Sequence, residues 1–291
     1  MNPEPPTFTH SQLLMNAPIH EACSSLPQVL QTNHSSSFSL RNLVLTAGGL
    51  IFPAIAFAGF LAGKRRIASL AAITSASLIM APTLSRNNSV FGPIFTRFRT
   101  SRREVWLTID DGPFSNETTS MLDVLAQYKA LATFFLVGDP VSQHPECVPQ
   151  ILAGGHTIGN HTQHHPINRF WALPSSAIQQ EISDCSRTLT FAGAPRPRWF
   201  RSPVGMTNPC IHPVLARERL KLIGWRAGGM DGFISAESYW NHRILPRLGP
   251  GAILLIHQLK QGGGAKTLSM LLKHLHQLGY SCVLPHEATL C

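Results

Sequence analysis

Charged residues are scarce in this sequence. Asp, Glu, Lys and Arg make up 13% of its 291 residues, against roughly 25% in soluble domains. Acidic residues are the scarcer kind, 15 against 24 Lys and Arg, so the formal net charge is +9. The basic residues form no single run, and no zinc-finger spacing or aromatic–basic ribonucleoprotein motif accompanies them, so nucleic acid is not predicted as a partner. A basic surface facing an anionic membrane or glycan fits this balance.

Two further patterns are missing. The six cysteines include no C-x-x-C pair, which argues against a metal knuckle or a disulfide scaffold, although one or two bridges in an oxidising compartment stay compatible with the spacing. No glycine-rich phosphate loop follows the first predicted strand, 104–109. That absence argues against a nucleotide-binding fold.

Charge is absent altogether from residues 42–63. At 1.5 Å per residue this stretch can span the roughly 30 Å hydrocarbon core of a membrane, and its proline and glycines are tolerated better in membrane helices than in soluble ones. A second uncharged stretch, 67–85, is diluted by Ser and Thr. We predict a membrane-anchor region over 41–86 with one or two transmembrane helices. A cleaved signal peptide fits less well, because the apolar run is long and starts late; a buried soluble helix pair is the other alternative.

The basic residues around these stretches bear on orientation. Lys64-Arg65-Arg66 lies between the two stretches, and only Arg41 precedes the first. The positive-inside rule places this short loop in the cytoplasm, so that two spans leave the C-terminal domain outside it. Arginines within 86–103 argue the other way. We expect a protein of the cytoplasmic (inner) membrane with its C-terminal domain on the extracytoplasmic face.

From residue 104 on, apolar strands alternate with amphipathic helices, which indicates a parallel α/β sheet. The predicted strands are 104–109, 132–137, 156–160, 198–201, 220–226, 252–256 and 280–284, and the predicted helices cover about 116–128, 140–153, 174–191, 207–218, 236–247 and 265–278. Seven strands favour an incomplete barrel over an open doubly wound sheet. Residues 1–40 lack periodicity and are predicted to be a disordered tail, or an over-long assigned start.

Polar residues gather where the predicted strands end. They are Asp110, Asp111, His161, His165, Arg201, Asp231 and His257. In α/β barrels, sites form at the C-terminal ends of the strands, so these side chains are expected at one rim. Adjacent carboxylates beside a dry sheet are costly without a positive partner. The Asp110–Asp111 pair is therefore either a metal or acid/base site, or a cap for the next helix.

Two of these histidines, His161 and His165, are four residues apart. In a helical turn this spacing puts both imidazoles on one face, where they can coordinate one metal ion. Asp111 would supply an oxygen ligand, and two His plus one carboxylate form a catalytic zinc set with an open position for water. The alternative is that one or both histidines only cap and pack a loop. His164 is the competing ligand, ranked below His165.

Four motifs stand in order along the C-terminal part of the chain. They are Thr108-Ile109-Asp110-Asp111-Gly112-Pro113, His161-Thr162-x-x-His165-Pro166, Arg201-x-Pro203-x-Gly205 and Ile253-x-Leu255-x-His257. Together they resemble the ordered motifs of the polysaccharide deacetylase family, also called the NodB homology domain or carbohydrate esterase family 4. The resemblance covers about 102–286, the expected catalytic domain. It implies a distorted (β/α) barrel, often with seven strands, and metal-dependent removal of an N- or O-acyl group from a sugar.

The resemblance also implies roles for individual residues. Asp111, His161 and His165 would hold the metal, usually Zn²⁺. Asp110 would be the general base, and Arg201 would pair with it and keep it ionised, since a nearby cation lowers the pKa of a carboxylate.

The other implied roles concern the leaving group and the pocket. His257 would be the general acid, paired with and tuned by Asp231. Val204, Gly205 and Leu255 would line the substrate and oxyanion pocket.

Two departures from the family pattern affect the pocket. Val204 stands where an aromatic usually follows the proline, and 228–232 replaces Asp-x-x-Asp-Trp while keeping only Asp231. We predict a membrane-anchored, metal-dependent deacetylase whose substrate is an N-acylated cell-envelope glycan, such as peptidoglycan or an exopolysaccharide, or a lipid-linked amino sugar. The alternatives are a catalytically degenerate glycan-binding or scaffold protein, and a deformylase or amidase on a non-polysaccharide substrate.

Overall fold

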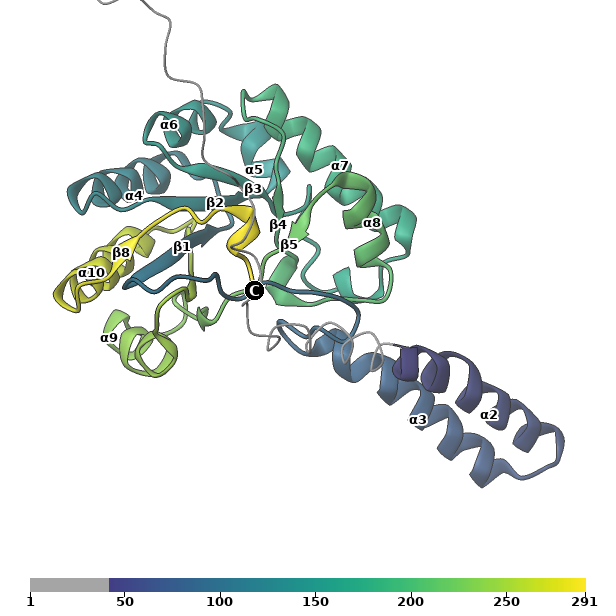
Figure 1. Ribbon diagram of the computed structural model, residues 1–291. Helices are drawn as coiled ribbons and strands as arrows, with labels where there is room; N and C mark the ends of the chain where they lie inside the picture. Colours follow the sequence, from purple (N-terminus) through teal and green to yellow (C-terminus); the bar gives the residue numbers. More distant parts are fainter. Residues whose placement is uncertain (1–41) are drawn as a thin grey trace, which may run out of the picture.

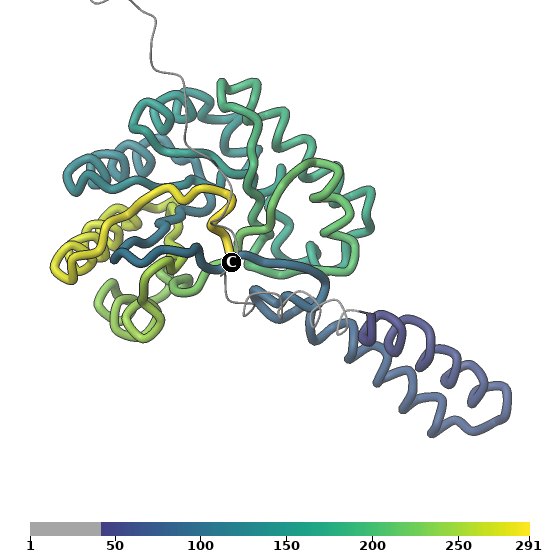
Figure 2. Tube along the Cα trace, viewed as in Figure 1, coloured from purple at the N-terminus to yellow at the C-terminus, as the bar shows by residue number. Residues whose placement is uncertain are grey.

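The chain forms a helical hairpin followed by an α/β domain (Figure 1). The structure, a computed structural model, describes residues 42–291. The predicted disordered tail over 1–40 lies outside the described residues. Figure 2 shows the two hairpin helices running side by side and projecting from the domain as an arm.

Two apolar helices build the hairpin. The first, Asn42–Leu61, contains a π-helical segment η1 (Ala47–Ile51) followed by α2 (Phe52–Leu61), and the second is α3 (Arg65–Leu84). Both are long and apolar enough to cross a membrane, and large side chains such as Phe57, 65% exposed, are uncovered. So much exposed apolar surface is unfavourable in water. The hairpin therefore has the character of a membrane anchor or a signal sequence.

The domain is built on one parallel sheet. Its strands are β1 (Glu104–Asp110), β2 (Ala132–Leu136), β3 (Thr157–Asn160), β4 (Trp199–Phe200), β5 (Lys221–Leu222), β6 (Ala227–Gly228), β7 (Ile253–His257) and β8 (Ser281–Cys282). Seven follow the order β5-β4-β3-β2-β1-β7-β6, and β8 pairs in parallel with the start of β1. This is the predicted distorted α/β barrel of seven parallel strands, with its ends at β5 and β6.

Helices cover the outside of the sheet (Figure 1). They are α4 (Ser115–Gln127), α5 (Gly138–Gln143), α6 (Cys147–Ala153), α7 (Ser175–Phe191), α8 (Ile211–Glu218), α9 (Ala236–Tyr239) and α10 (Gly264–Gln277). Short helical turns join them: η2 (Phe170–Ala172), η3 (Pro203–Gly205), η4 (Trp240–Ile244), η5 (Leu245–Arg247) and η6 (Glu287–Thr289). The five cysteines of the described part, Cys147, Cys185, Cys210, Cys282 and Cys291, are all free.

Side-chain alternation along β1 decides which residues reach the inside of the barrel. Leu107 and Ile109 join the core beneath the helices, so Thr108 and Asp110 point the other way, because successive side chains alternate in a strand. The parallel register with β7 sets Asp110 beside His257. The two residues therefore share the inner face at the same edge.

The segment between hairpin and domain is part of the barrel. The N–H of Phe95 donates to the Leu222 carbonyl oxygen of β5 at 3.0 Å, and the N–H of Ile253 in β7 donates to the Thr96 carbonyl oxygen at 3.2 Å. The segment thus bridges β5, one end of the seven-strand order, and β7, the strand next to the other end. It helps to close the barrel, although it precedes the predicted catalytic domain of 102–286.

Several predicted elements differ from the observed ones: the predicted strand 280–284 is only β8, and the predicted helix 236–247 is α9 followed by η4 and η5. The predicted strand 220–226 is only β5, and β6 follows it as a separate strand that the apolar pattern missed, because two residues are too short to produce a pattern. The predicted helix 140–153 is two helices, α5 and α6, separated around Pro145, since proline lacks the N–H that a helix interior needs. The predicted helix from residue 207 begins only at Ile211.

Candidate active site

Two adjacent carboxylates end β1. Asp110 is buried inside the barrel, and Asp111 follows it with a left-handed φ of 67°, which turns the chain out of the strand. Helix α4 has Phe114 at its N-cap and no side-chain cap bond. Capping of the next helix therefore does not account for the pair.

The loop after β3 supplies two histidines, and it is not helical as predicted. Thr162 and His165 have left-handed φ values of 70° and 50°, and these residues fold the chain back on itself. The imidazole rings of His161 and His165 consequently lie with their centroids 4.6 Å apart. The two imidazoles therefore come together through a folded loop, and not through the helical turn that their spacing predicts.

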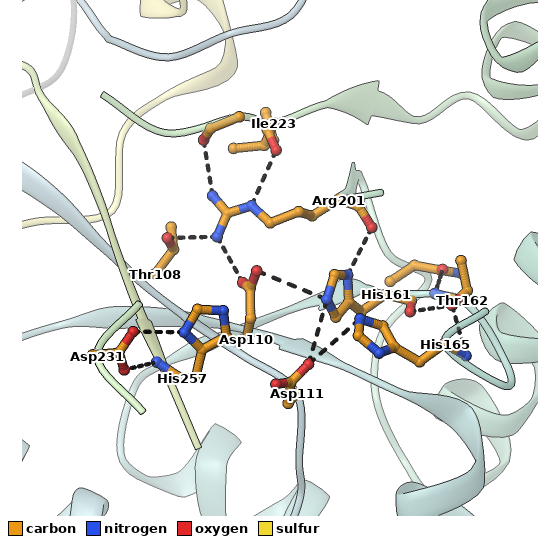
Figure 3. Close-up of polar contacts among 12 residues, drawn as sticks. Thr108, Asp110, Asp111, His161, Thr162, His165, Arg201, Ile223, Asp231 and His257 are labelled. Carbon is orange, nitrogen blue, oxygen red and sulfur yellow. Dashed lines mark hydrogen bonds and ion pairs between the residues drawn. The ribbon is translucent and has the colours of Figure 1, made fainter. Parts of the chain in front are cut away.

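Asp111, His161 and His165 form a cluster that could hold a metal ion (Figure 3). The Nε2 atoms of both histidines lie 3.6 Å from Oδ1 of Asp111, and one ligand atom from each residue falls within 4.8 Å of the others. His164, the competing ligand, lies outside this cluster and pairs with Glu181 at 3.0 Å.

Arg201 directly follows β4 and is buried. Its Nη1 donates to Oδ1 of Asp110 at 2.6 Å and to Oγ1 of Thr108 at 2.7 Å. Its Nε donates to the carbonyl oxygen of Ile223 at 3.1 Å, and its Nη2 donates to that of Gly224 at 2.9 Å. Because four of the five N–H donors of the guanidinium are used within the barrel, Arg201 is a fixed partner for Asp110.

His257 stands on the other side of Asp110. Its Nδ1 lies 2.7 Å from Oδ1 of Asp231, and its backbone N–H donates to Oδ2 at 2.8 Å. Asp231 is 4% exposed and follows β6. The bidentate contact sets the imidazole orientation and leaves Nε2 of His257 to face the site.

The buried charges shift the pKa values of the site. Burial raises the pKa of Asp110, with the Arg201 charge opposing, and raises that of Asp111 to about 6. Burial lowers the pKa of His161 and of His165 to about 3. Burial also acts to lower the pKa of His257, but the hydrogen bond and charge of Asp231 outweigh it and raise that pKa to about 9.

The Asp-His-His cluster fits a divalent metal. His161 and His165 are neutral at physiological pH, as imidazole ligands must be. Nε2 of His165 is buried without a hydrogen-bond partner, an unsatisfied state that a metal ion would relieve. Nδ1 of His161 contacts the Arg201 carbonyl oxygen at 2.7 Å, which is the outer contact usual for a metal-binding histidine.

The three expected pocket residues differ in exposure and in their backbone contacts. Val204, in η3, is 37% exposed with a φ of 49°. The N–H of Gly205 donates to the Ser202 carbonyl oxygen at 3.0 Å, so this amide is already used within the loop. Leu255 is buried in β7, and its carbonyl oxygen accepts a hydrogen bond from the Tyr239 hydroxyl.

Two supporting residues escaped the sequence analysis. Glu181 of α7 accepts hydrogen bonds from the backbone N–H groups of Gln163 at 3.1 Å and His164 at 3.0 Å, so it braces the histidine loop. Gln258 accepts from the Phe114 N–H at 3.2 Å and ties the Asp110–Asp111 turn to the end of β7. The sequence around each residue does not indicate its role, because each contacts residues more than ten positions away. The only clue for Gln258 is that it directly follows the motif that ends at His257.

Comparison with known proteins gives the same family as the sequence motifs. Residues 98–223 match the family model described as polysaccharide deacetylase. A chitooligosaccharide deacetylase of Bradyrhizobium sp. (strain ANU 289) is 33% identical over 158 residues, covering 53% of this chain and 70% of the relative. A peptidoglycan-N-acetylglucosamine deacetylase of Bacillus cereus is 33% identical over 191 residues, covering 62% and 85%.

A solved structure has the same fold. The family 4 carbohydrate esterase from Streptomyces lividans in complex with acetate superposes with a TM-score of 0.58 at 27% identity, covering 65% of this chain and 96% of the esterase. The chain belongs to the polysaccharide deacetylase family, carbohydrate esterase family 4, and it carries the Asp-His-His cluster typical of that family.

Proposed function

We propose that this protein is a membrane-anchored hydrolase that removes an N-acetyl or related acyl group from an amino sugar. One observation carries the proposal: a metal-binding cluster, a carboxylate held by Arg201 and a histidine held by Asp231 converge at one barrel rim. The chitooligosaccharide and peptidoglycan deacetylases among its relatives support the amide of an N-acetylated sugar as the bond cleaved. Candidate substrates are cell-envelope glycans and lipid-linked amino sugars.

Asp111, His161 and His165 would hold the metal, and two imidazoles with one carboxylate are a ligand set that suits Zn²⁺. Bound zinc would supply Lewis-acid chemistry, polarising the acyl carbonyl and lowering the pKa of water. Asp110 accepts the proton of the attacking water. Burial raises the pKa of this carboxyl, which brings the base closer to the working pH and makes proton transfer more favourable.

The remaining residues complete the reaction on the leaving-group side. The Val204 amide donates to the oxyanion that develops on the acyl oxygen. His257, protonated because its pKa is about 9, gives its proton to the departing sugar nitrogen, since an unprotonated amine is a poor leaving group. Asp231 holds this imidazole in place and stabilises its charged form.

We also propose that the hairpin anchors the enzyme in the cytoplasmic membrane with the domain on the extracytoplasmic face. Lys64, Arg65 and Arg66 stand at the turn between the two helices, at the end of the arm farthest from the domain (Figure 1). The positive-inside rule favours a cytoplasmic position for this tip. A reporter fused after residue 291 would measure the side on which the domain lies.

Acyl release tests the proposed chemistry. The full chain in vesicles with Zn²⁺ should release acetate from N-acetylglucosamine oligomers or from peptidoglycan fragments. Asp110→Asn and His257→Ala should each lower the rate by about 100-fold or more, the usual contribution of a general base or acid. Rates equal to the parent would show the roles to be wrong, and a chain that binds no zinc and releases no acyl group would favour a glycan-binding or scaffold protein.

A further inference from the structure

The active-site rim is tied to the end of the membrane hairpin. The backbone N–H of Asn87 donates to the Gly205 carbonyl oxygen at 3.1 Å, and its side-chain amide donates to the Trp225 carbonyl oxygen at 3.0 Å. Helix α3 ends at Leu84, and the chain from there to Asn87 extends at most about 11 Å. The loop that carries Gly205 is therefore held within a short distance of the end of α3.

This loop is continuous with the site itself. Gly205 lies four positions after Arg201 in the third motif, and Arg201 holds both Asp110 and His161. A second contact, from the hydroxyl of Thr207 to the Asn88 carbonyl oxygen at 3.5 Å, lies on the same loop. The catalytic rim is thus attached to the hairpin by fixed hydrogen bonds.

The length of α3 sets the depth at which the rim lies. Its 20 residues rise about 30 Å, the thickness of the hydrocarbon core. Leu84 then marks the edge of that core, and the polar headgroup layer adds only about 5–8 Å on each side. Asn87 and the loop bound to it consequently fall at the level of the headgroups or just outside them.

The rim also carries exposed apolar side chains, and their contact with water is unfavourable. Four large hydrophobic side chains stay exposed close to site residues: Ile167 at 43%, Val204 at 37%, Met230 at 39% and Phe233 at 85%. Each lies within three positions of His165, Arg201 or Asp231 in the chain. Exposed apolar side chains near a polar site are typical of a contact surface, and an exposed phenylalanine is a common membrane-interface residue of peripheral anchors.

We propose that this rim rests on the surface of the membrane that the hairpin spans, and that the substrate is an N-acyl amino sugar linked to a membrane lipid. The proposal rests on the proposed deacylation and names its substrate class. A lipid-linked sugar is presented at the headgroup layer, where the Asp-His-His cluster opens. A water-soluble glycan would have to enter between the rim and the bilayer, so it is the poorer substrate.

One experiment compares the two kinds of substrate. The full chain is reconstituted in phosphatidylethanolamine–phosphatidylglycerol vesicles with Zn²⁺. Acetate release is measured from polyprenyl-diphosphate-linked N-acetylglucosamine in the vesicles and from the water-soluble N-acetylglucosamine tetramer. We expect the rate on the lipid-linked sugar to be higher by about tenfold or more, the effect of placing one aromatic side chain into the interface.

A matched pair of phenylalanines isolates the rim. Phe191 is 96% exposed but ends α7, just before β4, so it lies at the opposite edge of the barrel, where strands begin. Phe233→Ser should lower the ratio of lipid-linked to soluble activity by about tenfold, while Phe191→Ser should change neither rate.

A second readout does not require catalysis. In vesicles of dibrominated lipids, the fluorescence of Phe233→Trp should be quenched more than that of the parent chain, and that of Phe191→Trp should not. Equal quenching of the two variants would overturn the placement of the rim on the membrane. Equal or better release from the soluble tetramer would overturn the lipid-linked substrate while leaving the deacetylase function standing. Release from neither substrate, with Phe233→Trp quenched, would contradict the proposed function and still support the membrane contact.

Discussion

The carbonyl oxygen of Arg201 lies 2.7 Å from Nδ1 of His161. Nδ1 must be the donor in this contact, because a carbonyl oxygen only accepts, and Nε2 of His161 is then left with its lone pair directed toward Asp111. The guanidinium of the same arginine holds Asp110. One buried residue therefore positions a metal ligand through its backbone and the proposed base through its side chain.

The ion pair between Arg201 and Asp110 can be tested by removing one charge and then both. We expect Arg201→Met to lower the free energy of unfolding by about 3–5 kcal/mol, because it leaves the Asp110 carboxylate buried without a partner. The double variant Arg201→Met with Asp110→Asn removes that charge as well and should recover much of the loss. Thermal denaturation of the three proteins measures both effects. A double variant no more stable than the single variant would contradict this account.

Metal binding should distinguish neighbouring histidines. We expect the parent chain to bind one equivalent of Zn²⁺ and to gain about 2.7 kcal/mol of stability at free zinc of about 100 times Kd. His165→Ala should lose most of this gain, because it removes a ligand of the Asp-His-His cluster. His164→Ala is the matched control and should keep it, since His164 lies outside the cluster. Isothermal titration measures zinc binding by each variant, and thermal denaturation with and without zinc measures the gain in stability. An equal loss of this gain in the two variants would contradict the assignment of His165 as a ligand.

The alkaline limb of activity should depend on Asp231. His257 donates a proton only in its charged form, and that form is lost as pH rises through a pKa of about 9. Asp231→Asn removes the negative charge that raises this pKa, and the burial of the ring, which lowers it, is then no longer offset. The alkaline limb of kcat/KM should therefore move to lower pH, by about two units or more toward the ordinary histidine value.

The pH profile has an internal control. Glu181→Gln alters the histidine loop but not the His257–Asp231 pair, so it should change the rate without moving the alkaline limb. An Asp231→Asn profile with its alkaline limb unmoved would mean that His257 is not the general acid.

The segment before the predicted catalytic domain should be needed for stability. Phe91 and Phe98 are buried, and a fully buried phenylalanine contributes about 1.5–3 kcal/mol. A chain that begins at residue 100 loses both, together with the backbone bonds of Phe95, and should be less stable than a chain that begins at residue 86 by about 3 kcal/mol or more. Thermal denaturation of the two chains measures the difference, and equal midpoints would show that the segment is dispensable.

Much of the fold and site could be predicted because the signals are local. Alternating apolar strands and amphipathic helices indicate a parallel barrel, and polar residues at successive strand ends indicate one rim. This order indicates that Asp111, His161 and His165 share one rim. The short strand β6 and the break between α5 and α6 were missed, because two-residue strands and a single proline leave little periodic pattern.

The sequence by itself determined the residue types of the site, their order along the chain and the apolar hairpin. Only the tertiary structure decided that the histidine loop is folded by left-handed residues and braced by Glu181, and that Asn87 fastens the third motif to the end of the hairpin. The physical reason is distance along the chain. Contacts such as the one from Asn87 to Trp225 join residues whose local sequences carry no sign of each other, so they exist only once the barrel has closed.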